Sequence, residues 1–109
     1  MIFHVVPAGE WTADTGRAYA PASLAAEGFI HCSSDEPAAL AVAEARFREV
    51  PDLLVLVIDE GRLRADVRRE GPGDAFPHVY GPIERSAVES VMAVHRDADG
   101  RPRRLVPWS

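Results

Sequence analysis

The chain has 109 residues, enough for one domain with its own hydrophobic core and too few for a second domain. Its net charge of −5 excludes a broadly basic surface, so we expect no nucleic-acid partner, and the basic cluster at 101–104 is expected to be solvated. A single cysteine, and no segment typical of secretion or of a membrane span, predict a cytoplasmic protein without disulfides or membrane contact.

The first third of the chain predicts two short strands with helical turns between them. An apolar run at 2–6 is typical of a strand, and Pro7 ends it. A brief helix is expected next, as far as Gly16, followed by a helical turn at 21–28 that ends in a glycine cap. The second strand is expected at 29–32.

The longest helix is predicted at 36–48, where Ser34 or Asp35 is expected to cap its N-terminus. Its apolar residues recur at helical spacing and predict one buried stripe: Leu40, Ala43, Phe47 and Val50. The uninterrupted apolar run at 53–58 follows, bounded by turn residues. Such a run is typical of a strand covered on both faces, so we expect it at the centre of the sheet.

The rest of the chain predicts further strands joined by loops. In chain order we expect a half-exposed strand at 63–70, a glycine-rich loop at 71–74, an extended stretch at 76–82, a turn or short helix at 84–86, a strand at 87–94 and a hairpin turn at 97–100 that returns into 104–106. Short strands interrupted by one main helix indicate an α+β fold. The sequence contains no P-loop, no dinucleotide GxGxxG motif and no zinc-binding HExxH or CxxC motif.

Three histidines lie inside apolar, strand-like stretches: His4, His31 and His78. Because alternate residues of a strand project from the same face, His31 is expected to share a face with Ser33, and His78 with Tyr80. We expect these two faces, together with His4, to line one polar cleft.

The same three histidines also allow a metal site, and a metal-dependent hydrolase built on them is one alternative function. They are far apart in the chain and show no spacing typical of zinc ligands, so no metal is expected. Cys32 follows His31 directly, so it is expected on the opposite face of the strand, in the core, where a cysteine is inert.

Three further side chains are candidates for contact with a ligand. Glu70 comes just before the glycine-rich loop and is the candidate catalytic carboxylate. Ser33 lies near the start of the long helix, where backbone N–H groups suit a phosphate or carboxylate, and its alternative role is to cap that helix. Tyr19 either belongs to the core or stacks on a planar ligand.

Two motifs, GFIHCS at 28–33 and FPHVYGP at 76–82, together resemble the small bacterial family catalogued as domain of unknown function 952. The resemblance covers nearly the whole chain. That family is similar in turn to a minimal ADP-ribosyltransferase core, a small split mixed β-sheet with one main helix that binds NAD in a central cleft. The resemblance therefore implies NAD, or a related nucleotide, as the ligand.

The resemblance also implies roles for particular residues. His4 is expected to hold the adenosine ribose, the stretch 31–33 to line the nicotinamide site, and Glu70 or the stretch 78–80 to supply the catalytic acid. The catalytic residues expected are Glu70, His78 and His31. The ligand contacts expected are His4, Tyr19, Ser23, His31, Ser33 and Tyr80.

The function that follows is binding of NAD or a related nucleotide. If the protein is an enzyme, the resemblance implies an ADP-ribosyltransferase or NAD glycohydrolase, with chemistry at the glycosidic carbon of the nicotinamide ribose. A non-catalytic module that binds a metabolite is the second alternative, beside the metal-dependent hydrolase.

Overall fold

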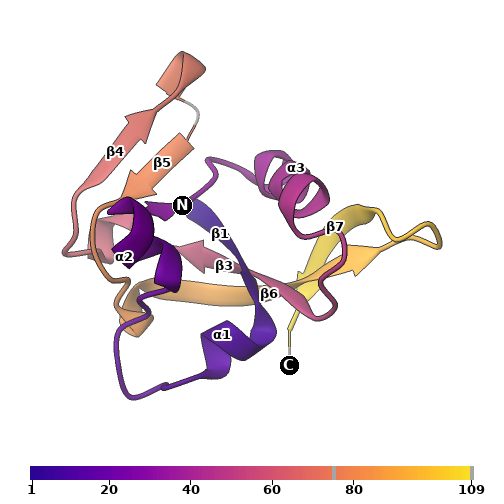
Figure 1. The fold of residues 1–109 in the computed structure, drawn as a ribbon, viewed down its shortest axis with the longest axis horizontal. Helices are drawn as coiled ribbons and strands as arrows, with labels where there is room; N and C mark the ends of the chain where they lie inside the picture. Colours follow the sequence, from indigo (N-terminus) through magenta and orange to yellow (C-terminus); the bar gives the residue numbers. More distant parts are fainter. Residues whose placement is uncertain (75, 109) are drawn as a thin grey trace.

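Two antiparallel sheets and three α-helices make up the fold of the described residues, 1–74 and 76–108, in a computed structural model (Figure 1). The larger sheet has the order β1-β3-β6-β7 and consists of β1 (Ile2–Pro7), β3 (Leu53–Ile58), β6 (Val88–Arg96) and β7 (Pro102–Pro107). The smaller sheet has the order β2-β5-β4 and consists of β2 (Ile30–His31), β5 (Phe76–Val79) and β4 (Val67–Glu70). The helices are α1 (Ala8–Thr12), α2 (Ala22–Glu27) and α3 (Glu36–Arg46), and 3-10 turns lie at Glu60–Arg62, Pro72–Asp74 and Arg85–Ala87. No helix among these residues is long and apolar enough to cross a membrane.

The α+β fold and the single long helix were predicted, and the structure confirms them. The expectation of a mixed sheet is wrong, because every strand pair in the described part of the chain is antiparallel. Short turns join β4 to β5 and β6 to β7, and a short turn can only return the chain in the opposite direction. A parallel pair needs a crossover of a dozen residues or more.

The helix α3 begins at the predicted cap and covers one face of the larger sheet. The carboxylate of Asp35 accepts a hydrogen bond from the backbone N–H of Ala38 at 2.8 Å, so Asp35, and not Ser34, is the cap. The fully buried helix residues are Ala39 and Ala43. Of the predicted stripe, Ala43 is buried and Phe47 and Val50 pack against the same cluster, whereas Ala39 is buried in place of the half-buried Leu40.

The strand β3 lies in the middle of the core, as its sequence predicts, and its side chains alternate between two clusters. One cluster packs between the two sheets and includes Ile2, Val6, Ile30, Leu54, Leu56, Ile58 and Val79. The other cluster packs beneath α3 and includes Val5, Ala39, Ala43, Leu53 and Val55. Both faces of β3 are thus covered, which explains why its sequence is apolar without interruption.

The two sheets meet where β2 ends. Ser33 exchanges two backbone hydrogen bonds with Phe3 of β1, at 2.7 and 2.9 Å, while the N–H of Cys32 donates to the carbonyl of Pro77 in β5 at 2.9 Å. This junction brings β1 beside β2 and so places His4 behind His31. In Figure 1 the β4–β5 pair and the turn between β6 and β7 lie at opposite ends of the molecule.

Candidate functional site

Pairing of β2 with β5 brings two of the predicted site residues together. His31 and His78 are direct partners in the antiparallel ladder, and their ring centroids lie 5.5 Å apart. Directly opposed residues share a face of the sheet, so both rings project to the same side. The ring of Phe76 lies 5.4 Å from that of His31 on this face.

A carboxylate holds His78 from the neighbouring strand. Oε1 of Glu70 lies 3.0 Å from Nδ1 of His78, and the hydroxyl of Tyr80 donates to the same oxygen. These bonds, that of Tyr80 first and that of His78 second, lower the pKa of Glu70, while donation to Glu70 raises the pKa of Tyr80. A carboxylate only accepts hydrogen bonds, so Nδ1 of His78 carries the proton.

Aromatic and cationic contacts fix the rings of this group. The ring of Phe29 stacks on His78 with a centroid distance of 4.0 Å and an interplanar angle of 15°. The guanidinium of Arg68 lies 4.7 Å from the centre of the Tyr80 ring. Sequence reasoning missed Phe29, although its position two residues before His31 in an extended stretch is a signal that could have found it.

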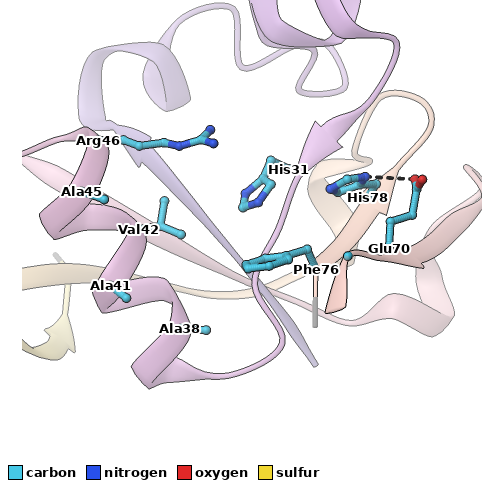
Figure 2. A pocket seen from close by; sticks show the side chains of 10 residues that line it. His31, Ala38, Ala41, Val42, Ala45, Arg46, Glu70, Phe76 and His78 are labelled. Carbon is cyan, nitrogen blue, oxygen red and sulfur yellow. Dashed lines mark hydrogen bonds and ion pairs between the residues drawn. The ribbon is translucent and has the colours of Figure 1, made fainter. Parts of the chain in front are cut away.

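One wall of a hollow of about 490 Å³, which we call the larger hollow, is formed by His31, Glu70, Phe76 and His78 (Figure 2). The opposite wall is α3, which contributes Ala38, Ala41, Val42, Ala45 and Arg46. Sequence reasoning missed this wall and Arg46. The signal was available, because residues three and four apart on a helix share a face and most residues on this one are alanine.

A second hollow of about 120 Å³, the smaller hollow, adjoins the first. The residues that line both hollows are His31, Val42 and Arg46. The residues that line only the smaller one include His4, Ser23 and Ser33. The single predicted cleft is therefore two hollows: the predicted contacts His4, Ser23 and Ser33 lie on one side of His31, and the Glu70–His78 pair lies on the other.

His4 lies behind the site and holds it in place. Its Nδ1 lies 2.7 Å from the carbonyl oxygen of His31 and its Nε2 lies 3.0 Å from the hydroxyl of Tyr19. Burial lowers the pKa of His4 to about 4, so the ring is neutral at pH 7. Nδ1 then donates to the carbonyl, which only accepts, and Nε2 accepts from Tyr19.

Tyr19, the predicted stacking residue, lies in the core. Only 4% of its surface is exposed, and burial raises the pKa of its hydroxyl. Trp11 packs against its ring at 5.9 Å between centroids. The structure thus favours the first of the two roles considered for Tyr19, and its hydroxyl acts on the site through His4.

Two groups that could act as bases or nucleophiles differ in their surroundings. The pKa of His31 is lowered by partial burial and by the nearby positive charge of Arg46. Cys32 faces the core as predicted, 1% exposed, and burial raises the pKa of its thiol to about 12. The prediction that Cys32 is inert is consistent with this geometry, because a thiol that stays protonated is a poor nucleophile.

The three histidines do not share a metal-binding geometry. Within residues 1–74 and 76–108, no group of three or more His, Cys, Asp or Glu side chains is arranged to hold a metal ion. Both ring nitrogens of His4 are engaged by protein groups, so His4 cannot join His31 and His78 as a ligand. The three-histidine site required by the metal-dependent hydrolase is therefore not formed.

Comparison with known proteins gives a family and a fold. The family model described as "Protein of unknown function (DUF952)" matches residues 5–91. The crystal structure of protein CC0527 from Caulobacter crescentus is similar, with 32% sequence identity, a TM-score of 0.79, and coverage of 94% of this chain and 92% of that chain. The solution NMR structure of CC0527 matches at 32% identity with a TM-score of 0.75, over 94% of this chain and 90% of that chain. No curated protein matches the chain.

Proposed function

Because the chain belongs to the DUF952 family, whose description assigns no function, we propose a function from its own site: it binds a nucleotide, NAD or a close relative, across the two hollows that meet at His31. The proposal concerns binding first. Chemistry at the glycosidic carbon, with Glu70, His31 and His78 as acting residues, is a further step that turnover of the bound ligand tests.

The observation that carries the proposal is the position of Arg46. This residue lines both hollows, and among the described residues no carboxylate forms an ion pair with it. A guanidinium forms paired, charge-assisted hydrogen bonds with phosphate oxygens. A ligand whose two ends fill the two hollows has its middle beside Arg46, and the middle of a dinucleotide carries its phosphates.

The walls of the hollows also fit such a ligand. Alanine side chains of α3 and the ring of Phe76 line the larger hollow, which gives a planar base an apolar surface to lie on. In the smaller hollow the half-buried Ser23 supplies a hydroxyl group for a polar contact. The expected similarity of the DUF952 family to a minimal ADP-ribosyltransferase core is the reason for naming NAD among the nucleotides.

Titration calorimetry and thermal shift with NAD, ADP-ribose and nicotinamide test the proposal. We expect saturable binding of NAD and ADP-ribose, and a stabilisation of about 2.7 kcal/mol at a hundredfold excess over Kd. Arg46→Ala is expected to weaken both by roughly 10- to 100-fold, because a charged hydrogen bond is lost. Nicotinamide carries no phosphate, so its binding should not change.

His31→Ala is also expected to lose the stabilisation by NAD. Two exposed residues of the larger sheet, His95 and Arg104, provide matched controls for His31→Ala and Arg46→Ala. Their alanine variants should bind NAD like the parent. No response to any of the three ligands, or an equal loss in the control variants, contradicts the proposal. Release of nicotinamide from bound NAD separates an enzyme from a non-catalytic binding module.

A further inference from the structure

The Glu70–His78 pair sets the direction of one hydrogen bond in the larger hollow. Oε1 of Glu70 accepts from both Nδ1 of His78 and the hydroxyl of Tyr80. With its proton held on Nδ1, a neutral imidazole has a lone pair on Nε2 and can only accept there. The site is thus preset to receive a donor.

The ring of His78 has little freedom to turn away from this arrangement. Its side chain is 15% exposed, and Phe29 stacks on its face at 4.0 Å. The strand that carries it is paired on both sides, with β2 and with β4. Figure 2 shows the ring between Glu70 on one side and His31 on the other, so the free nitrogen faces the hollow.

A cation lies at the other end of the same hollow. Arg46 and His78 both line it, and in Figure 2 the His31 ring lies between them. A guanidinium only donates hydrogen bonds and binds anions, whereas Nε2 of His78 binds donors. The two ends therefore select opposite groups of one ligand.

We propose that the larger hollow is a sugar-phosphate site, in which Arg46 binds the phosphate and His78, held by Glu70, accepts a hydrogen bond from a sugar hydroxyl. This rests on the proposed nucleotide binding and deepens it, because it places the ribose phosphate unit of the nucleotide. A phosphate at the His78 end is rejected, since a lone pair would face an anion. Glu70 is a positioning residue that acts through His78.

Two measurements test the proposal without NAD. Long-range ¹H–¹⁵N spectra of the parent should show the proton of His78 on Nδ1, and Glu70→Gln should give a mixture of both tautomers. NMR titrations should show ribose 5-phosphate binding about 5- to 10-fold more tightly than inorganic phosphate, the value of one neutral hydrogen bond.

Variants test whether the tighter binding of ribose 5-phosphate, compared with inorganic phosphate, depends on His78. His78→Phe keeps a flat ring against Phe29 and removes the acceptor, so ribose 5-phosphate and phosphate should bind alike. Arg46→Ala should weaken both, while His95→Ala should change neither. A parent with the proton on Nε2, equal binding of the two probes to the parent, or an advantage that survives His78→Phe overturns the proposal. If NAD binds while the two probes bind equally, only this inference fails; if nothing binds, the proposed function fails as well.

Discussion

The two sheets differ in burial, and the difference separates the buried core from the candidate site. In β3 of the larger sheet five of six residues are buried, whereas in β4 of the smaller sheet three of four are exposed. The central strand of the larger sheet is apolar and covered on both faces, and the smaller sheet presents Glu70, His78 and Tyr80 on one face. A polar network at an exposed edge adds little to folding, so this sheet can hold a site at small cost to stability.

The largest loss of stability should come from truncating a core side chain of the larger sheet. Leu56 is fully buried between the sheets, and Leu56→Ala is expected to lower the free energy of unfolding by about 2–5 kcal/mol. Val67→Ala, at the one half-buried position of β4, should cost about 1 kcal/mol, because less contact is lost. Denaturant unfolding measures the loss of unfolding free energy in both variants. Equal losses would show that the two sheets contribute equally to stability.

The junction between the sheets should be sensitive to acid. Burial lowers the pKa of His4 from 6.5 to about 4, so as pH falls the unfolded chain takes up a proton before the folded one does. Stability is therefore lost as pH falls from 6.5 towards 4, by about 3 kcal/mol in total. Unfolding curves at several pH values should show a shallower decline in His4→Gln than in the parent. His95→Gln serves as the exposed control. If stability declines as steeply in His4→Gln as in the parent, protonation of His4 is not the cause of the acid sensitivity.

In the larger sheet, Arg96 should contribute more to the free energy of unfolding than the exposed Arg103. The guanidinium of Arg96 in β6 donates to the carbonyls of Phe47, Arg48, Val50 and Gly100 at 2.8–3.2 Å. Arg96→Ala leaves acceptors at the end of α3 unpaired and should cost about 2 kcal/mol in unfolding free energy. The exposed Arg103, 3.9 Å from Asp97, is the matched control, because its alanine variant should be near neutral. Similar losses for the two variants would mean that the carbonyl contacts of Arg96 add nothing.

The smallest effect compares two glycines outside the strands: Gly71, which follows β4, and Gly100, between β6 and β7. Gly71 and Gly100 both have a φ of +82°, so alanine at either position costs about 1 kcal/mol of backbone strain. A Cβ on Gly71 would lie 2.9 Å from Cδ2 of Phe76, whereas none of the described atoms lies within 4 Å of a Cβ on Gly100. Gly71→Ala should therefore be the less stable variant and should also weaken NAD binding, because the Phe76 ring moves in the hollow. Thermal melts and calorimetry check this, and equal behaviour of the two variants would contradict it.

The parts of the fold that depend on local signals were predictable. The apolar run at 53–58 and the cap of α3 follow from neighbouring residues alone, and both are observed. The strand expected at 29–32 is shorter, Ile30–His31, because Cys32 and Ser33 turn to different partners. Those partners, Pro77 and Phe3, are distant in the chain, and periodicity carries no information about them.

The site was predictable to the same extent. Alternation along a strand placed His31 and His78 on faces that could meet, and pairing of β2 with β5 brings them together. The surroundings of His4 depend on Tyr19, fifteen residues away, so its burial as a neutral support was not visible. Arg46 was missed because an exposed arginine on a helix is ordinarily solvated, and only tertiary packing sets it over the two hollows.

The buried thiol of Cys32 makes the junction between the sheets observable. The chain has one cysteine, and it lies 1% exposed where β2 leaves β5 for β1. With a pKa of about 12, the closed protein offers a labelling reagent neither access nor thiolate. Every labelling event therefore requires the junction to open. The rate at which Cys32 is modified therefore reports how often the junction between the two sheets opens.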